Sequence, residues 1–283
     1  MSINEQWIWL PSQLYPNDQK TNYNAFTDKP DKGYAVAEFL KSYTFDEKAV
    51  SVKLRFSGDT TFRLYCNGQI VATGPACVGG DFIGNDTPRT PYYAFETEIF
   101  PDSSLLELRA EVQMTPAQIC EFSMGHGGFM LGGIVEFESG KNQIISTDSS
   151  WLARKLCSYT SVGNFDGRIP SDEYVSAEAT ENVWNTVTAP IPIREEREIF
   201  PEGCNILLAP LEEKEIILDF DRIYAAFLHV KADNAESIEA TVYAREIDEE
   251  GTAENIALGP GSDFRGFYLH SVGNIRAQLK NLS

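Results

Sequence analysis

The side chains best suited to hold a ligand occur in two glycine-rich segments. Residues 79–86 read Gly-Gly-Asp-Phe-Ile-Gly-Asn-Asp and bring the oxygen ligands Asp81, Asn85 and Asp86 close together in sequence. Carboxylate and amide oxygens are the ligands that Ca²⁺ prefers, although the regular spacing of an EF-hand loop is absent from this segment. Asp81, Asn85 and Asp86 are therefore candidate calcium ligands, and the alternative is a polar hairpin loop.

The second segment, residues 124–129, reads Met-Gly-His-Gly-Gly-Phe and contains His126, one of three histidines in the chain. Glycines leave the backbone free to frame a ligand, but they serve equally well in an ordinary turn. We therefore expect His126 to lie in a loop, either as a ligand-binding residue or as part of a structural turn.

Other familiar reaction motifs are missing from the sequence. The chain contains no Gly-x-Ser-x-Gly elbow of a serine hydrolase and no Cys-x-x-Cys pair, so a zinc site is not expected. Its five cysteines are odd in number and widely spaced, which favours reduced thiols in a cytoplasmic protein over a disulfide framework.

The net charge of the chain limits the kinds of partner that we expect it to bind. The formal net charge of −19 argues against binding to nucleic acid or to an anionic membrane surface. No apolar stretch approaches the roughly 20 residues of a transmembrane helix, and the first residues do not resemble a signal peptide. We expect a cytoplasmic protein, and the sequence does not predict its oligomeric state.

The elements that position these segments are predicted to be β-strands, because hydrophobic residues alternate with polar ones in almost every ordered-looking stretch. Asn67-Gly68, flanked by two alternating runs, predicts a hairpin with a type I′ turn. A two-residue turn there places Leu64 opposite Val71 and Phe62 opposite Thr73, in a half-buried hairpin whose Arg63 and Tyr65 point away from the core.

The predicted fold is all-β, an antiparallel jelly-roll-like sandwich followed by a second, smaller or incomplete β domain. The first domain is expected at residues 1–187. A proline-rich and charged linker follows at 188–202, and the second domain spans 203–283. The second domain shows fewer strands than a complete sandwich needs, so we expect it to be truncated.

The order of these motifs resembles the N-terminal β-sandwich region of bacterial α-L-rhamnosidases and related large glycosidases. The match begins with Leu-Tyr-x-Asn-Gly at residues 64–68 and Gly-Pro at 74–75. Further matching stretches, in chain order, are Trp7 to Pro11, Tyr92 to Phe95, Leu105 to Ala110, Gly132 to Phe137, Ser146 to Trp151, Phe165 to Arg168, Trp184, Leu218 to Phe220, and Val242 to Glu246. The chain departs from the family pattern at Gly167, where alanine is expected, and at Ala225-Ala226, which replace a glycine-rich segment.

The resemblance implies that the catalytic carboxylates of the parent enzyme lie in an (α/α)6 barrel that these 283 residues do not contain. Glycoside hydrolysis needs two converging carboxyl groups, and we assign no catalytic residue here. The expected function is to brace that barrel and to contact a rhamnosyl glycan. The alternatives are a free-standing carbohydrate-binding module and a structural or assembly domain without a ligand.

A sugar site needs an aromatic ring for stacking and polar side chains for the hydroxyl groups. The aromatic residues that lie in polar stretches, where we expect the rings to be free, are Tyr15, Tyr23, Phe26, Tyr92 and Tyr93. Together with the two glycine-rich segments, this makes Asp81, Tyr92 and His126 the candidate sugar-binding residues. No cofactor is expected apart from calcium at Asp81, Asn85 and Asp86.

Overall fold

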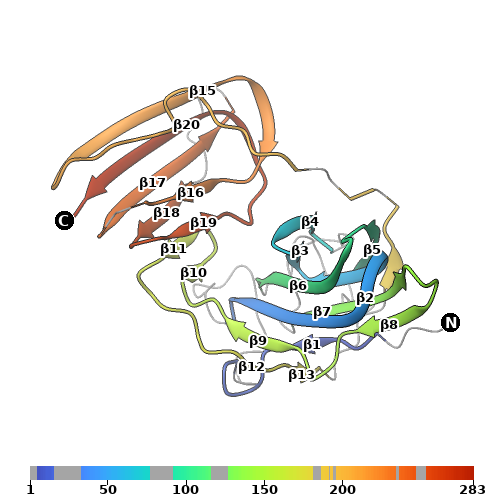
Figure 1. Ribbon diagram of the computed structural model, residues 1–283. Coiled ribbons are helices and arrows are strands. Elements are labelled where there is room, and N and C mark those ends of the chain that lie inside the picture. Colours follow the sequence, from blue (N-terminus) through green and yellow to red (C-terminus); the bar gives the residue numbers. More distant parts are fainter. Residues whose placement is uncertain are drawn as a thin grey trace, which may run out of the picture. The chain divides into compact units, whose positions relative to one another are not determined.

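The computed structural model describes residues 5–15, 33–76, 92–115, 127–180, 186–190, 192–193, 196–233, 236–246 and 253–283 (Figure 1). In this part of the chain every regular element is a strand, which confirms the all-β class and the succession of a sandwich and a second β unit. No helix among these residues is long and apolar enough to cross a membrane. The described cysteines Cys66, Cys157 and Cys204 are free thiols, and burial raises the pKa of Cys66 to about 11.

The chain divides into two compact units, and the first comprises Met1–Leu156 together with Asp172–Glu195. Its strands are β1 (Ile8–Trp9), β2 (Ala35–Asp59), β3 (Thr61–Cys66), β4 (Gln69–Thr73), β5 (Tyr92–Ile99), β6 (Ser103–Met114), β7 (Gly128–Phe137), β8 (Asn142–Ser146), β9 (Leu152–Lys155), β12 (Val175–Ser176), β13 (Glu178–Ala179) and β14 (Thr186–Thr188).

The second unit comprises Cys157–Ser171 and Glu196–Ser283. Its strands are β10 (Tyr159–Ser161), β11 (Asn164–Asp166), β15 (Glu213–Ala226), β16 (His229–Lys231), β17 (Ile238–Arg245), β18 (Ala253–Leu258), β19 (Asp263–Arg265) and β20 (His270–Asn281). The predicted domain boundary differs here, because residues 157–171 were expected in the first domain. Instead, β11 pairs in parallel with β18, so a short excursion of the chain completes the edge of the second sheet.

The first unit is built around β2, which takes part in both layers of the sandwich. Residues 35–44 of β2 pair with β6, and residues 37–40 pair with β9 on the other side. After a register shift between Thr44 and Ala49, residues 49–59 pair with β7 and residues 52–56 with β5. One long strand therefore bends from one sheet into the other and links the two layers covalently.

The core lies between these two layers and is rich in aromatic rings. Phe39, in the first half of β2, stacks on Phe129 of β7 with ring centroids 5.5 Å apart. Phe56, in the second half, meets Phe62 of β3 edge to face at 5.6 Å. All four rings are fully buried. Each pair joins a strand of one layer to a strand of the other, so the alternating pattern of the sequence becomes a packed interior.

The Asn67-Gly68 hairpin is confirmed, with φ angles of 46° and 80° at the two turn residues. The predicted register holds only next to the turn. Beyond it Leu64 pairs with Ala72 and Arg63 with Thr73, because a bulge between Leu64 and Tyr65 shifts the pairing by one residue. The predicted partners Val71 and Thr73 for Leu64 and Phe62 are therefore wrong.

The second unit is a sheet of six strands in the order β10-β11-β18-β17-β20-β15, with β16 and β19 forming a separate pair. One face of β17 and β18 carries buried apolar residues such as Val242, Ala240 and Ile256. Tyr159 and Phe165, from the excursion, pack with Phe264 of β19 at centroid distances of 5.1–6.1 Å. The excursion and the β16–β19 pair thus supply the core of this unit.

Candidate functional site

Two of the three candidate sugar-binding residues and all the candidate calcium ligands belong to segments outside the described residues. Asp81, Asn85 and Asp86 lie in 77–91, and His126 lies in 116–126. Tyr92 is the first described residue after one segment, and Gly127 is the first after the other. We call the described residues that directly flank each segment the root of that segment.

Asp59, the last residue of β2, joins these roots. Its carboxylate is fully buried and accepts hydrogen bonds from the Tyr92 hydroxyl at 2.8 Å and the Gly127 amide at 3.0 Å. The Thr60 hydroxyl donates a third at 2.9 Å. Burying a carboxylate is costly unless donors compensate it, and here two of the three donors are the first described residues after the two segments. One acidic side chain therefore holds the roots of both segments that carry the sequence-predicted ligands.

Backbone hydrogen bonds close the root of residues 77–91 as well. The amide of Ala76, the last described residue before that segment, donates to the Thr60 carbonyl at 2.9 Å. The Ala76 carbonyl in turn accepts from the Tyr93 amide at 2.6 Å. The two ends of the segment thus leave the sandwich side by side, next to Asp59.

Tyr92 differs from its expectation as an exposed stacking platform. It lies in β5, it is 3% exposed, and its ring packs edge to face on Trp7 at a centroid distance of 6.3 Å. Tyr15, also expected to be free, is buried and donates a hydrogen bond to the Gly33 carbonyl at 2.7 Å. Burial, together with the nearby Asp59 charge, raises the pKa of the Tyr15 hydroxyl. Both tyrosines shape the base of the site and present no open ring to a sugar.

The glycines after His126 have a structural role. Gly127 has φ of +67°, and a Cβ atom there would lie 2.2 Å from the Trp9 ring. A Cβ on Gly128 would lie 2.7 Å from the Trp7 ring. These two glycines make room for the tryptophans beneath them, and Gly128 already belongs to strand β7.

A row of charged side chains, which the sequence did not reveal, crosses the layer formed by β9, β2, β6 and β3. Glu38 of β2 lies directly between Arg154 of β9 and Glu111 of β6, and Glu111 lies opposite Arg63 of β3. Arg109, two residues before Glu111, bonds to both glutamates, at 2.9 Å in the case of Glu38. We call these five side chains the charged row. The charges alternate in sign because Arg109 separates two carboxylates that would otherwise face each other.

The charged row is largely removed from solvent. Glu38 is 4% exposed and Arg63 is 3% exposed. Strand β3 of the hairpin predicted to be half-buried is therefore buried on both faces, whereas β4 is only partly buried. The Arg109 guanidinium stacks on the Tyr65 ring at 3.7 Å, and the Arg154 guanidinium stacks on the Tyr174 ring at 4.4 Å. Each charge is thus compensated both by an ion pair and by hydrogen bonds or ring contacts.

Glu38 is not suited to act as a general acid. Burial by itself raises the pKa of its carboxyl. The hydrogen bond from Tyr174 at 2.5 Å and the charges of Arg154 and Arg109 outweigh burial and hold that pKa below the ordinary 4.5. A glycosidase acid requires the opposite shift, because it must keep its proton near neutral pH. The charged row therefore stabilises the layer formed by β9, β2, β6 and β3, and Glu38 does not supply acid–base chemistry.

No metal site is found among the described residues, where no group of three or more His, Cys, Asp or Glu side chains could hold an ion. The calcium candidates are outside this part of the chain and remain predictions. Asp59 itself was missed by the sequence analysis, because an aspartate at the end of an alternating strand looks like an ordinary loop residue.

The Asp59 substitution tests whether one carboxylate holds both roots. Asp59→Asn is expected to lower the free energy of unfolding by about 2 kcal/mol, because an amide cannot accept from Tyr92, Thr60 and Gly127 at once. Tyr92→Phe removes a single donor and should cost about 1 kcal/mol. Urea unfolding followed by tryptophan fluorescence measures both losses. Equal losses for the two variants would contradict the claim that the Asp59 carboxylate holds both roots.

Comparison with known proteins adds the fold relationship. No protein-family model matches the chain, and no curated protein matches it in sequence. Among solved structures, the chain is similar to an α-L-rhamnosidase from Dictyoglumus thermophilum, with a TM-score of 0.56 and 16% identity, covering 88% of this chain and 31% of that one. It is also similar to a native α-L-rhamnosidase from Aspergillus terreus, with a TM-score of 0.52 and 13% identity, covering 95% of this chain and 34% of that one.

The chain thus spans about a third of the length of these rhamnosidases. At such low identity the likeness establishes the fold, and the resemblance noted in the sequence is confirmed at that level. This chain has the fold of the N-terminal β region of α-L-rhamnosidases.

Proposed function

We propose that this chain is the non-catalytic N-terminal part of an α-L-rhamnosidase-type glycoside hydrolase. The observation that carries the proposal is the fold match, which takes in nearly all of this chain but only about a third of each enzyme. The order of motifs along the sequence supports the same conclusion independently. In this role the two β units brace a separate catalytic domain.

The same proposal includes contact with a rhamnose-containing glycan at the Asp59 end of the first unit. The support is local: a buried carboxylate holds together the roots of the two segments that carry Asp81 and His126. Tyr92 contributes by bonding to Asp59 and not by stacking on a sugar. A small neutral sugar on a shallow loop site has few atoms to bind, so the expected dissociation constant is on the order of 1 mM, or about 4 kcal/mol.

The non-catalytic part of the proposal predicts that the purified 283-residue chain does not hydrolyse an aryl α-L-rhamnoside. The reason is that the resemblance assigns the acid pair to a separate barrel, and that Glu38 holds its proton too weakly to act as a general acid. Release of the aryl alcohol measures turnover. Activity that survives repeated purification and disappears when one carboxylate of this chain is replaced would contradict the proposal.

A further inference from the structure

The outer edge of β15 is open. This strand ends the six-stranded sheet and pairs with β20 at residues 213–219 and 224–226, and no other described strand pairs with it. Segment 202–207, which begins with a turn, makes no backbone hydrogen bond to β15 within the described chain. An edge strand of 14 residues with unpaired amides and carbonyls is a template for another strand.

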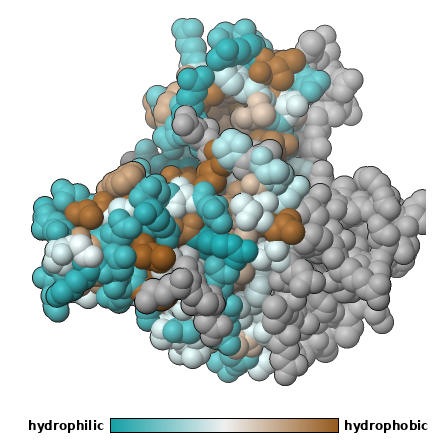
Figure 2. All heavy atoms as spheres, turned by 90° about the vertical axis from the view of Figure 1, so that its right-hand side faces the viewer, coloured by the Kyte–Doolittle hydropathy of each residue, from teal (hydrophilic) through white to brown (hydrophobic). Residues whose placement is uncertain are grey.

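β15 also lines a groove of about 550 Å³. Its walls are β15 and segment 202–207, and the lining includes Ile206, Leu207 and residues 216–218. Leu207 is 89% exposed and Ile217 is 57% exposed. In Figure 2, separate hydrophobic residues, in brown, lie among hydrophilic ones on the described part of the surface. The groove therefore offers apolar contacts next to unpaired backbone groups.

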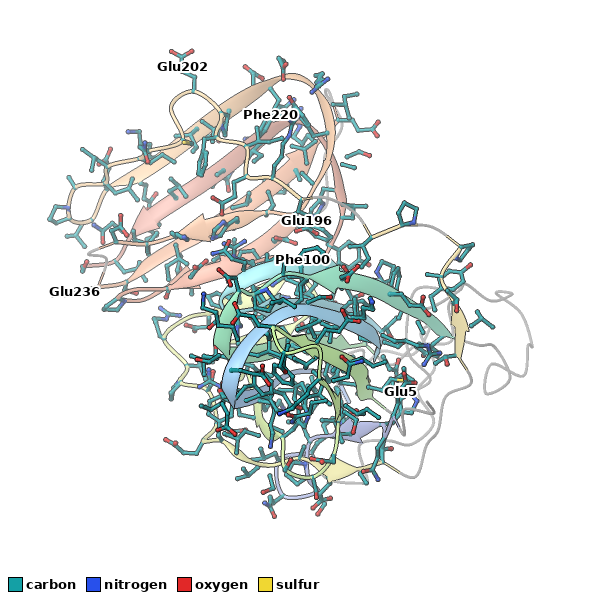
Figure 3. All side chains as sticks on the ribbon, turned by 45° about the vertical axis from the view of Figure 1, so that its right-hand side comes forward. Glu5, Phe100, Glu196, Glu202, Phe220 and Glu236 are labelled. Carbon is teal, nitrogen blue, oxygen red and sulfur yellow. The ribbon has the colours of Figure 1, made fainter. Side chains whose placement is uncertain are left out.

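The two ends of the groove differ in charge. Lys214 stands at one end of the β15 wall, and Asp219 follows the other end, about 17 Å away for five residues of strand. Glu202, labelled on its loop in Figure 3, precedes Gly203, which lies against Leu218 at the Asp219 end. Lys214, Asp219 and Glu202 take part in no ion pair among the described residues. An occupant of matching charge is therefore acidic near Lys214 and basic near Asp219.

A second copy of β15 is disfavoured in the registers centred on the apolar residues of the groove. In a symmetric antiparallel pair, residues that face each other lie on the same face of the sheet, so the twofold axis passes between the two copies of one residue. An axis at Ile216 sets Glu213 against Asp219, and an axis at Ile217 sets Glu215 against Asp219. An axis at Leu218 sets Lys214 against Arg222. Like charges that face each other destabilise a strand pair, so all three registers are disfavoured.

We propose that the open edge of β15 binds an extended segment of a different polypeptide in the antiparallel direction. The segment has a basic residue opposite Asp219, apolar residues opposite Ile216, Ile217 and Leu218, and an acidic residue opposite Lys214. Main-chain hydrogen bonds to the edge provide affinity, and the charges at the two ends fix the register. This interface lies in the second unit and does not depend on sugar binding by the first.

Two peptides of the same composition test the register. One reads Lys-Val-Ile-Val-Thr-Glu, and the other exchanges its two charged residues, with identical uncharged flanks on both. Each is titrated into the full chain while amide chemical shifts are followed by NMR. The first peptide is expected to give saturable shifts centred on residues 214–219, with a dissociation constant at least fivefold lower than that of the exchanged peptide.

Reversal of the protein charges supplies the decisive comparison. The double variant Lys214→Glu with Asp219→Lys is expected to prefer the exchanged peptide, whereas Ile223→Ser, on the same strand outside the groove, should leave the original preference unchanged. Circular dichroism confirms folding of each variant. The proposal is overturned if neither peptide binds saturably, if the intact protein binds both equally, or if the folded double variant keeps the original preference. Dimerisation of the chain through β15, detected by sedimentation, would also overturn it.

Discussion

Arg109→Met is expected to lower the free energy of unfolding of the first unit by about 3 kcal/mol, since removing one partner of a buried ion pair leaves the other charge uncompensated. Arg109 bonds to both Glu38 and Glu111, which face each other on neighbouring strands. Methionine keeps much of the side-chain volume but leaves the two carboxylates in direct repulsion. Trp7, Trp9 and Trp151 are all buried in the first unit, so urea unfolding followed by tryptophan fluorescence measures the loss.

Arg276→Met is the matched control. Arg276 also bonds to a glutamate on a neighbouring strand, Glu215 at 2.9 Å, but it lies in the second unit and both side chains are more than a third exposed. Its loss should cost at most about 1 kcal/mol, as is usual for surface ion pairs. Urea unfolding of this variant is followed by far-ultraviolet circular dichroism, because the described tryptophans all lie in the first unit. Similar losses for both variants would show that burial of the charged row contributes nothing.

The Arg109 effect should also depend on pH. The pKa of Glu38 is held below its ordinary value of 4.5 in the folded chain, so its ionised form stabilises the fold above that pH. As the pH falls through the folded pKa, Glu38 takes up a proton and this stabilisation is lost. The difference in stability between the original protein and Arg109→Met should therefore shrink between pH 7 and pH 3. A difference that stays constant over this range would contradict the claim that ionised Glu38 stabilises the fold.

Gly127→Ala is the second substitution with a large expected effect, a loss of about 3 kcal/mol from left-handed strain and overpacking together. Gly127 has φ of +67°, and a methyl group there would overlap the buried Trp9 ring. Either the Trp9 side chain or the backbone at residue 127 must move. The same fluorescence-detected unfolding measures the loss, and the Trp9 emission should change even before unfolding.

Gly140→Ala separates strain from overlap, because Gly140 has φ of +81° but nothing lies within 4 Å of the added methyl group. That variant should lose only about 1 kcal/mol. If Gly127→Ala lost no more free energy of unfolding than Gly140→Ala, the close approach of Trp9 to the backbone would not be what requires glycine at position 127.

Local rules explain what could be predicted from the sequence. Asn67-Gly68 adopts the predicted turn because few residues other than asparagine and glycine tolerate its positive φ angles. The predicted alternation along β2, β3 and β6 is confirmed, because Phe39, Phe62 and Leu108 lie in the core where their layer faces a second layer. These features depend on neighbours in sequence and on one buried face.

Long-range pairing explains what could not be predicted. The bulge at Leu64 shifts the hairpin register, although no turn residue marks it. The charged row looks like a solvent-exposed face in sequence, since only the pairing of three strands brings Glu38, Arg109 and Arg154 together. The excursion of residues 157–171 into the second unit depends on β18, about 90 residues later in the chain.

The rhamnose site proposed at the Asp59 end of the first unit is tested most directly by titrating L-rhamnose into the full chain while following amide shifts by NMR. Parallel titrations with Ca²⁺ and with a chelator test the predicted calcium ligands Asp81, Asn85 and Asp86. We expect saturable shifts with a dissociation constant on the order of 1 mM, confined to Asp59, Thr60, residues 76–93 and residues 116–129. An absence of saturable shifts, or shifts confined to the second unit, would contradict it.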